Sequence, residues 1–499
     1  MEKNFIILVN MKNKVIENFY IQLPCKFDQI LKKINLNLNG VVFVVNKNKK
    51  LIGSISDGDI RRKILQRKKN VDIITSRFDL INKKTIFGKI SDSKEKLLEL
   101  FSIQKPKIKC LPLLNKKKQI VDICFFDKLN SIPLLEPFID KNEINNVLNC
   151  LQTGWLSSKG IYVKKFENAF SKFLGGGHAV SVTNGTAAIE LALATLGIKK
   201  GDEVILPNFT FGATINAVIN VGAKPVVVDI DKDSWTISLK AIKKKITKKT
   251  KALIIVHIYG LVCNLSEISK LVKKKKLFLI EDCAEALGSK YGKKYIGNHG
   301  DCSTFSFYPN KTITTGEGGM AVFKSKKAFN RSLILRNQGR EISDIFFIHQ
   351  ERGFNYRMSN IQAAIGYAQM FKIKKFLSLR KNIFKFYDKV FKKYKDIELM
   401  PNSKNTENSG WLYTIKLNSF DLIKRNKLIN QLKNNGIEAR PVFFPLHKMK
   451  PYKEFCIGNY PSSEEVSYKS ISLPSSPFLS KKELKYVSDI VIKEVEKII

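Results

Sequence analysis

Short runs of apolar residues alternate with amphipathic segments over most of the chain, from about residue 137 onward. Such runs, bounded by turn residues, are typical of buried strands, and the longer segments between them have the spacing of helices with one apolar face. The runs lie at 179–183, 203–207, 225–230, 252–258, 277–282 and 303–307. This alternation predicts a mostly parallel sheet that is covered by helices on both faces.

The C-terminal part of the chain repeats this pattern on a smaller scale. WLYTIKL (411–417) and IEARPVFF (437–444) have the apolar content of strands, and the segment 422–436 between them has the spacing of an amphipathic helix. We therefore expect a large α/β domain over 137–395 and a small α/β lobe over 396–499.

Residues 1–130 predict a separate α/β module. Val41–Val45 is a β-branched run, LIGSIS (51–56) has the pattern of a second strand after a polar turn, and a helix-like segment follows at 57–65. Strand, lysine-rich turn, strand and helix recur at Cys110–Leu129. Two weakly similar halves indicate an internal duplication.

Composition narrows the class of protein. A chain of 499 residues is too long for one ordinary core, and 44% hydrophobic residues are ample for folded interiors. No apolar run is long enough for a membrane span, and the N-terminal segment has no clear signal-peptide cleavage site. The eight cysteines are scattered without a C-x-x-C pair, which fits neither a zinc site nor a secreted disulfide framework. We expect a reducing cytoplasm.

The net charge of +43 raises the question of a nucleic-acid partner. The lysines lie throughout the chain, without interleaved aromatic residues or a recognised reading motif. We therefore interpret them as solvated faces and predict no nucleic-acid partner, although the charge can assist an anionic substrate.

One lysine has an informative context. Lys311 lies in SFYPNKTITTGEGG (306–319), between the end of a predicted strand and a glycine-rich turn that lets the backbone pass close to a ligand. A lysine amine condenses with an aldehyde to give a Schiff base, and pyridoxal phosphate (PLP) is the cofactor that uses this bond. Such a cofactor also needs a carboxylate for its ring nitrogen, a cradle for its phosphate and an aromatic face for its ring.

Acidic residues supply the candidate carboxylates. Asp282 ends the predicted strand 277–282, where it can pair with the pyridinium nitrogen and keep it protonated. Glu285 is placed to approach the 3′-oxygen of the ring. The pair Glu281–Asp282 is alternatively a metal site or a helix cap, but no histidine cluster accompanies it, so we predict no metal.

The phosphate cradle is predicted at the turn after strand 179–183. Gly185 and Thr186 open a helix there, and a helix N-terminus presents backbone N–H groups and a positive dipole end to an anion. Ser306 is a second candidate phosphate donor. Phe211, in PNFTFGAT, can stack on the pyridine ring, although an ordinary core phenylalanine is the alternative.

These motifs agree in order with a known family. The segments that carry the likeness are GWLSSKG (154–160), NGTAAIELAL (184–193), PNFTFGAT (207–214), VHIYG (256–260), EDCAEALGS (281–289), SFYPNKTITTGEGGM (306–320) and GFNYRMSNIQAAIG (353–366). From about 137 to 499 the chain resembles the DegT/DnrJ/StrS sugar-nucleotide aminotransferases.

The resemblance implies the fold-type I architecture of PLP enzymes and a homodimer with shared active sites. On the family pattern Lys311 is the Schiff-base lysine and the catalytic residue, with Asp282, Glu285 and Phe211 in the roles given above. The phosphate ligands implied by the family are Gly185, Thr186, Ala187 and Ser306, with Asn355 reaching the phosphate from the other subunit.

The implied reaction moves an amino group from glutamate to a nucleotide-linked keto sugar, for which we expect a 4-keto-6-deoxyhexose, in amino-sugar and surface-polysaccharide biosynthesis. The predicted substrate contacts are Trp155, Ser157, Lys159, Arg440 and His447. The chain departs from the family pattern at Asn184, Glu285 and Tyr308, where serine, glutamine or histidine, and histidine are frequent. None of these changes removes a core function.

The first 130 residues resemble a pair of CBS domains, a module that often binds adenine nucleotides. Ser56 and Asp59 match the family's ribose-binding pattern, because a carboxylate can accept hydrogen bonds from both ribose hydroxyls. In the second half Cys124 stands in place of the hydroxyl residue. A structural or dimerising module without a ligand is the alternative.

Two other functions remain open for the larger part of the chain. One is a PLP-dependent sugar dehydratase on the same fold; related dehydratases carry histidine in place of the Schiff-base lysine, so Lys311 favours amino transfer. The other is a sensor that binds the nucleotide sugar without turnover, against which the intact lysine, aspartate and glycine set argues.

Overall fold

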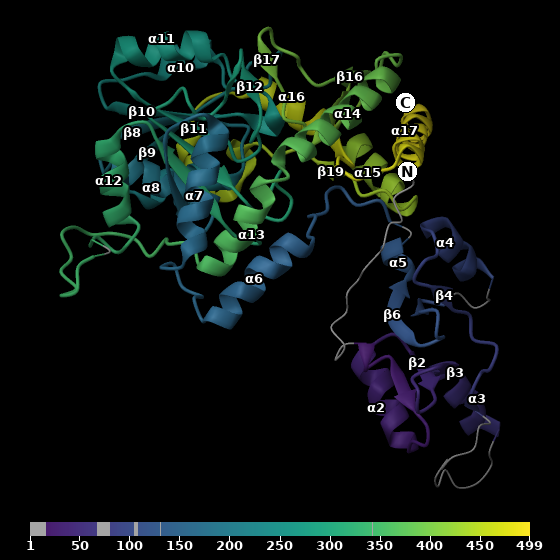
Figure 1. Cartoon of the computed structure of the whole chain (residues 1–499). Coiled ribbons are helices and arrows are strands. Elements are labelled where there is room, and N and C mark those ends of the chain that lie inside the picture. The colour runs from purple at the N-terminus through teal and green to yellow at the C-terminus, as the bar shows by residue number, and fades with distance from the viewer. Residues whose placement is uncertain (1–15, 67–79, 104–107, 130, 342) are drawn as a thin grey trace. The chain divides into compact units, whose positions relative to one another are not determined.

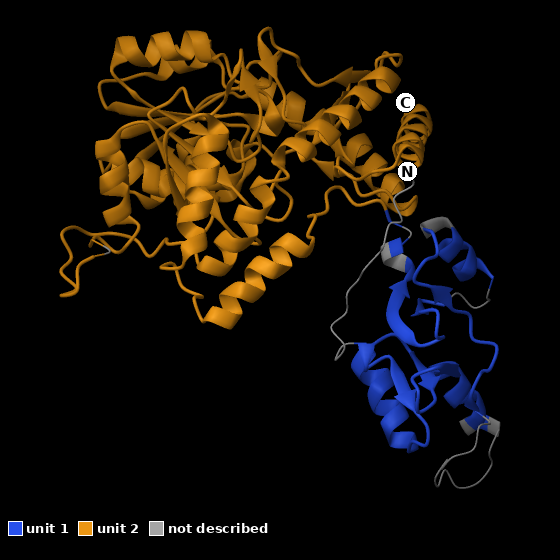
Figure 2. Cartoon of the chain, viewed as in Figure 1, with its two compact units in different colours: residues 1–131 blue, residues 132–499 orange. Residues whose placement is uncertain are grey.

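The computed structural model describes residues 16–66, 80–103, 108–129, 131–341 and 343–499 (Figure 1). The chain forms two compact units, 1–131 and 132–499 (Figure 2). Within the described ranges, no helix has both the length and the apolar character that a membrane crossing requires. Each of the eight cysteines is a free thiol.

The first unit consists of two halves with the same order of elements. The first half contains β1 (Tyr20–Gln22), α2 (Phe27–Asn37), β2 (Val41–Val45), β3 (Leu51–Ser56) and α3 (Asp57–Gln66). The second contains β4 (Gly88–Lys89), α4 (Lys94–Ser102), β5 (Cys110–Leu114), β6 (Ile120–Phe125) and α5 (Phe126–Leu129). In each half the first two strands pair in parallel and the last two antiparallel. The structure therefore has the internal repeat that the sequence predicts.

The two halves of the first unit share a hydrophobic core. Phe43 and Val45 of β2 are buried in the same cluster as Cys110 and Leu114 of β5. Each half also has a cluster of its own, around Val42 and Val44 in the first half and around Leu111 and Leu113 in the second, so the shared core lies between two separate ones.

A seven-stranded sheet forms the centre of the second unit. Its strands are, in spatial order, β7 (His178–Val182), β15 (Gly319–Phe323), β14 (Cys302–Ser306), β11 (Phe278–Asp282), β10 (Thr250–Val256), β8 (Glu203–Pro207) and β9 (Lys224–Val228). The six strands predicted from the apolar runs are all present, each within two residues of the expected bounds.

The seventh strand, β15, is an exception to the predicted parallel arrangement. It runs antiparallel to both of its neighbours, β14 and β7, whereas the other pairs in the sheet are parallel. The sheet is therefore mixed. The prediction missed β15 because its short apolar run begins inside a glycine-rich stretch, which has the pattern of a loop.

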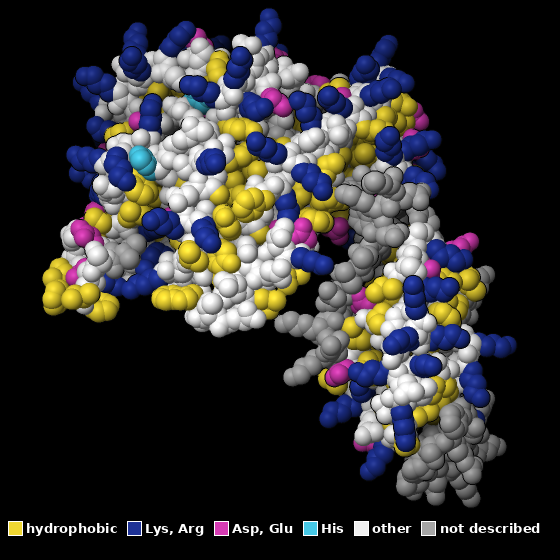
Figure 3. All heavy atoms as spheres, viewed as in Figure 1, with side chains coloured by type: hydrophobic (Ala, Val, Ile, Leu, Met, Phe, Trp, Pro, Cys, Tyr) yellow, Lys and Arg dark blue, Asp and Glu magenta, His cyan; other side chains and the backbone are white. Residues whose placement is uncertain are grey.

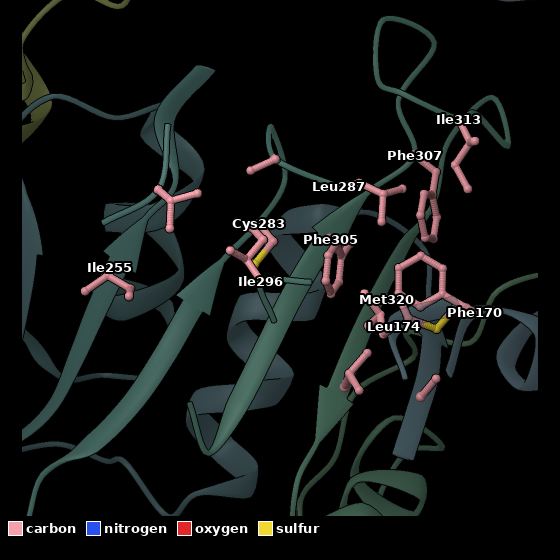
Figure 4. Close-up of a cluster of buried hydrophobic side chains, with 14 of the residues drawn as sticks. Phe170, Leu174, Ile255, Cys283, Leu287, Ile296, Phe305, Phe307, Ile313 and Met320 are labelled. Carbon is pink, nitrogen blue, oxygen red and sulfur yellow. The ribbon is translucent and has the colours of Figure 1, made fainter. Parts of the chain in front are cut away.

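Alternate residues of the strands point to opposite faces of the sheet, and each face has its own hydrophobic core. Leu253 and Ile255 of β10 pack with helices α7 (Ile161–Leu174) and α11 (Leu265–Lys275), in the core that Figure 4 shows around Phe170 and Phe305. Ala252 and Ile254 of the same strand face α8 (Gly185–Thr195), α9 (Gly212–Asn220) and α12 (Lys326–Leu335). The remaining helices of this part are α6 (Lys141–Thr153), α10 (Leu239–Lys245), α13 (Asn360–Met370) and α14 (Ile373–Phe391).

The C-terminal lobe has its own four-stranded sheet and core. The sheet consists, in spatial order, of β16 (Ile397–Leu399), β18 (Tyr413–Leu417), β20 (Ser470–Leu473) and β19 (Arg440–Pro441), with helices α15 (Leu422–Asn434), α16 (Pro461–Lys469) and α17 (Lys481–Glu496). Its core also includes Ile132 and the α14 residues Tyr387 and Phe391. The core of the lobe therefore includes residues that precede the predicted boundary at 395/396. The lobe belongs to the same compact unit as the large sheet.

Short elements complete the second unit. A small antiparallel sheet contains β13 (Lys294–Tyr295), β12 (Lys290–Tyr291) and β17 (Thr406–Glu407), and 3₁₀ turns lie at η2 (Ile258–Gly260), η3 (Leu446–Lys448) and η4 (Lys450–Phe455). Lysine and arginine side chains are spread over the visible face rather than gathered in one patch (Figure 3).

Candidate active site at the carboxyl end of the sheet

Lys311 lies in the turn after β14, and its amine is buried among the carboxyl ends of the parallel strands. Its Nζ lies 3.5 Å from Oε1 of Glu285 and 3.9 Å from the ring centroid of Trp411. Burial lowers the pKa of this amine below its ordinary value, although Glu285 and Asp282 act in the opposite direction. An amine with a lowered pKa is more often neutral, which is the form that attacks an aldehyde or accepts a proton.

Asp282 is the last residue of β11, in register with Val256 of β10 and Thr304 of β14. The carboxylate is buried and accepts hydrogen bonds from the Thr214 hydroxyl (3.0 Å) and from the backbone N–H of Ala284 (3.1 Å). Burial raises the pKa of Asp282, and these two hydrogen bonds limit the rise. The site thus holds a fixed carboxylate that a cationic ring nitrogen would compensate.

Glu285 follows in the turn after β11. Its Oε2 accepts the backbone N–H of Tyr259 at 3.0 Å, and its other oxygen faces Lys311. Burial raises the pKa of Glu285 to about 7, against the opposing effect of Lys311. This carboxyl therefore changes its charge near neutral pH.

Replacement of Glu285 by glutamine is expected to remove a pH-dependent loss of stability. The wild-type carboxyl ionises near pH 4.5 in the unfolded chain and at about 7 in the folded chain. Between these values the folded state binds more protons, so wild-type stability falls as the pH rises, by about 3 kcal/mol in total. Urea titrations near pH 4.5 and above pH 7 should show the variant gaining that amount relative to wild type. The exposed Glu317→Gln change is the control, and an equal difference at both pH values would contradict the expectation.

The predicted phosphate cradle joins two elements. Gly185 is the first residue of α8, and a Cβ atom added to it would lie 2.9 Å from Cβ of Ser306, the last residue of β14. Only a glycine lets these two segments approach so closely. Thr186 is half-buried in the same first turn, and the backbone N–H of Ala187 donates to the Asn184 side chain at 2.8 Å. A phosphate would have to displace this cap to use the Ala187 N–H.

One glycine after Lys311 permits a close approach within the chain. A Cβ on Gly319 would lie 2.3 Å from the carbonyl oxygen of Asn184. This glycine therefore lets β15 approach the backbone of the cradle, and the approach of the glycine-rich turn to a ligand stays a prediction.

Phe211 caps the N-terminus of α9, and its ring is 63% exposed. The ring lies 5.7 Å from the Phe443 ring. An aromatic side chain this open is not the ordinary core phenylalanine that the sequence left as the alternative. Its stacking on a cofactor ring stays a prediction.

Asn355 is exposed on the segment before α13, where Asn337 pairs with it across a β-bridge. The next residues pair with the end of β7, through a hydrogen bond from the Thr183 N–H to the Tyr356 carbonyl (2.9 Å). Its contact with a phosphate in a second subunit stays a prediction.

The predicted substrate residues do not form one cluster of contacts. Trp155, Ser157 and Lys159 are exposed between α6 and α7, and Asn360 holds the Trp155 carbonyl at 2.6 Å. Arg440 is exposed and forms an ion pair with Glu438 at 2.6 Å. All four therefore remain available for a substrate, and their roles stay predictions.

His447 has partners for both of its ring nitrogens within the chain. Nδ1 lies 2.8 Å from Nδ2 of Asn208, and Nε2 lies 2.9 Å from Oε1 of Glu464. The ring also stacks on Tyr460. These contacts fasten the C-terminal segment to the end of β8, so we interpret His447 as a residue that supports the site.

One buried cluster, His257, Glu281 and Cys283, has the donor atoms of a metal site. Glu281, however, already accepts the backbone N–H groups of Gly297, His299 and Gly300, and the His257 ring lies 3.2 Å from it. The carboxylate is thus saturated by the chain itself, and it ties the loop before β14 to β11.

In the first unit Ser56 and Asp59 are in direct contact. The Ser56 hydroxyl donates to Oδ2 of Asp59 at 2.7 Å, and Arg62 binds the other oxygen at 2.6 Å. The pair lies at the start of α3, as the sequence predicts, but its carboxylate is engaged within the chain.

Sequence reasoning missed three residues of the site: Thr214, Tyr259 and Trp411. Thr214 and Tyr259 lie inside the motifs PNFTFGAT and VHIYG, so their neighbours in the sequence were the available signal. Trp411 comes from the C-terminal lobe, one hundred residues after the lysine, and no local pattern connects the two.

Comparison with known proteins agrees with this geometry. The model of the DegT/DnrJ/EryC1/StrS aminotransferase family matches residues 137–492. The GDP-perosamine synthase of Escherichia coli O157:H7 is 42% identical over 360 residues, which cover 72% of this chain and 97% of that protein. Spr1654 from Streptococcus pneumoniae, in its PLP form, superposes with a TM-score of 0.71 at 29% identity, covering 74% of this chain and 100% of that chain. Helicobacter pylori PseC, an aminotransferase involved in the biosynthesis of pseudoaminic acid, gives a TM-score of 0.70 at 29% identity and covers 74% and 100%.

The residues present fit PLP. A glycine that allows α8 to approach Ser306, a buried carboxylate at the end of β11, a buried amine beside it and an exposed aromatic ring are the groups that this cofactor requires. The fold and the site thus define a PLP-dependent aminotransferase, and the chain belongs to the DegT/DnrJ/EryC1/StrS aminotransferase family.

Proposed function

We propose that the chain transfers the amino group of glutamate to a GDP-linked 4-keto-6-deoxyhexose, for surface-polysaccharide biosynthesis in the cytoplasm. The similarity to GDP-perosamine synthase over nearly the whole length of that protein supports the nucleotide and the sugar. Perosamine is a 4-amino-4,6-dideoxyhexose, so amino transfer that makes its GDP-linked form consumes the corresponding 4-keto sugar. The single observation that carries the chemistry is the buried Lys311 amine, which contacts Glu285 and is near enough to Asp282 for that carboxylate to raise its pKa.

Each side chain of the site has a separate role in binding the cofactor or in moving the proton. Bound PLP supplies an aldehyde that carries the amino group and a ring that accepts electrons. Asp282, fixed by Thr214 and Ala284, would hold the ring nitrogen in its protonated form. Lys311 would supply the amine that holds the cofactor, and its free amine would take a proton from the donor's carbon and later return it. Phe211 would cover one ring face, and the Gly185–Ser306 cradle would hold the phosphate.

Two half-reactions test this proposal. Glutamate alone should bleach the visible absorbance of the loaded protein, and a GDP-linked 4-keto-6-deoxyhexose should restore it. Mass spectrometry of a panel of keto-sugar nucleotides with other bases and with 3-keto sugars then measures the preference. Faster turnover of a sugar linked to another nucleotide would overturn the GDP assignment, and bleaching by other amino acids but not by glutamate would overturn the donor.

We further propose that two copies of the chain form the working enzyme. Four consecutive apolar residues, Ile345 to Ile348, are exposed on the segment that projects after α12 (green in Figure 1) and appear as a yellow tip in Figure 3. Helix α6 exposes Ile144, Leu148 and Leu151, at the spacing of one helix face. Apolar surface of this kind is typical of an interface.

Mixed dimers test whether the sites are shared. If Asn355 acts in the partner's site, mixing the inactive Lys311→Ala and Asn355→Ala variants should restore activity, because each hybrid then has one complete site. A monomeric wild type in sedimentation experiments would overturn the proposal.

For the first unit we propose a CBS-domain pair that binds an adenine nucleotide at Ser56 and Asp59. The duplicated order of elements and the position of the pair at the start of α3 support it. Ribose binding would exchange the Ser56 and Arg62 contacts of Asp59 for hydroxyls. AMP or ATP should raise the melting temperature of wild type but not that of Asp59→Ala. If neither nucleotide changes the melting temperature or the activity of either protein, the unit is structural.

A further inference from the structure

Lys311 is part of a closed ring of four residues that come from distant parts of the chain, in which Tyr259 takes part with both its backbone and its side chain. Its amine contacts the Trp411 indole face and Glu285. Glu285 accepts the N–H of Tyr259, and the Tyr259 ring stacks on Trp411, with centroids 5.8 Å apart and planes at 18°. Each member therefore has two neighbours within the ring, and the contact with Trp411 joins the C-terminal lobe to the lysine.

Trp411 contacts the lysine and its backbone at the same time. The indole is buried, and its N–H donates to the carbonyl of Asn310, the residue directly before Lys311, at 2.6 Å. The face of the same indole lies 3.9 Å from the lysine nitrogen, within the range of a cation–π interaction. One side chain thus fixes both ends of the lysine, the start of its backbone and the amine at its tip.

Tyr259 is held in a backbone conformation that side chains rarely adopt. Its φ of 50° and ψ of 26° are left-handed, and the residue is buried. This conformation directs the N–H to Glu285, while the hydroxyl accepts the N–H of Phe443 at 2.9 Å. Strain of this kind persists where the surrounding structure requires it, and it is frequent at active sites.

We propose that Trp411 is a positioning residue for Lys311, whose indole face holds the protonated amine in place while the lysine is detached from the cofactor. Two carboxylates act on the amine: Glu285, which contacts it from the turn after β11, and Asp282, whose charge raises its pKa from the end of that strand. Either carboxylate attracts the protonated amine but can also take its proton. The indole face attracts the positive charge and cannot accept the proton, so the proton stays on Lys311 until it is returned to the substrate.

The orientation of the ring explains why a tryptophan suits this place. A Trp face attracts a cation more strongly than the face of Phe or Tyr does, and the attraction grows when water is excluded. A leucine would fill part of the volume but would provide no negative face. The amine would then lose a stabilising partner of its charged form, and its pKa would fall.

The test measures the pKa of the Lys311 amine in cofactor-free protein, so it does not depend on the substrate proposed above. Trace acetylation across a range of pH, with the Lys311 peptide quantified by mass spectrometry, gives this value. The three tryptophans of the chain can be replaced biosynthetically by mono-, di- and trifluorinated analogues, which weaken the ring face with little change in shape. We expect the pKa of Lys311 to fall stepwise, by about 0.5–1.5 units over the series.

Variants separate this role from simple packing. Trp411→Phe should keep the pKa closer to wild type than Trp411→Leu does, because it retains an aromatic face. The matched control is Trp235→Leu, since Trp235 is a fully buried tryptophan of the same apolar cluster. The control should lose stability without moving the pKa of Lys311. A pKa that stays constant along the fluorinated series, or that moves equally with Trp235→Leu, would overturn the proposal, even if the leucine variant at 411 fails to fold.

Discussion

Replacing Lys311 by alanine is expected to abolish amino transfer, with a fall in turnover of at least about 10⁴-fold. The variant loses the amine that holds the cofactor and the base that moves the proton, and no other lysine takes part in the contacts around Glu285 and Asp282 in the described part of the chain. Single-turnover kinetics with glutamate measure the loss. Borohydride reduction of loaded wild type should place a reduced adduct on the Lys311 peptide, and the variant should carry none.

A second buried lysine provides the matched control for this change. Lys416 lies in the C-terminal lobe, where it forms ion pairs with Glu398 and Glu465. Lys416→Ala should lower the melting temperature, because it leaves two carboxylates without their partner, yet it should keep the borohydride adduct and the chemical step. If Lys311→Ala turned over like wild type, our assignment of the site would be wrong.

Asp282→Asn is expected to reduce turnover by about 10²–10³-fold while leaving the fold intact. The amide has the shape of the carboxylate: its one oxygen can accept the Ala284 N–H, and its NH2 group can donate to the Thr214 hydroxyl oxygen. It carries no charge, however, to hold a proton on the cofactor's ring nitrogen. Losses of this size are typical when one fixed electrostatic partner is removed from a water-excluded site. Glutamate half-reaction rates measure the effect, and the visible spectrum of the loaded variant reports on the ring.

Asp301→Asn is the control for this second prediction. Asp301 accepts the N–H of Leu279 at 2.9 Å near the start of the same strand, far from the reacting groups. Its amide variant should keep the half-reaction rate within a few-fold of wild type. A normal rate for Asp282→Asn would mean that the ring nitrogen does not depend on this charge.

Much of the fold could be predicted because most strands lie in the centre of the sheet. A central strand is apolar on both faces, so its run of Val, Ile and Leu residues is continuous and easily recognised, as in 252–258. Strand β15 lacked this signal, because it begins with a glycine. The carbonyl of Asn184 lies so close to Gly319 that a larger residue would not fit there. A contact between segments more than one hundred residues apart leaves no trace in the local pattern.

The candidate site was predictable to the same extent. Lys311, Asp282 and Glu285 lie at or just after the ends of neighbouring strands, and the edge of a parallel sheet brings such positions together. The sequence could not indicate that the ring nitrogens of His447 contact Asn208 and Glu464, and its contact with a substrate stays a prediction. Trp411 could not be foreseen, because its place beside the lysine depends on how the C-terminal lobe packs.

The adjacent acids Glu281 and Asp282 point to opposite faces of β11, as neighbours in a strand must. One is saturated by the loop at 297–300, and the other is open to the reaction. Deleting a single residue earlier in this strand would shift both acids by one position and turn each to the other face. Asp282 would then take the place of Glu281, and Cys283 would take the place of Asp282, so the site would lose its carboxylate.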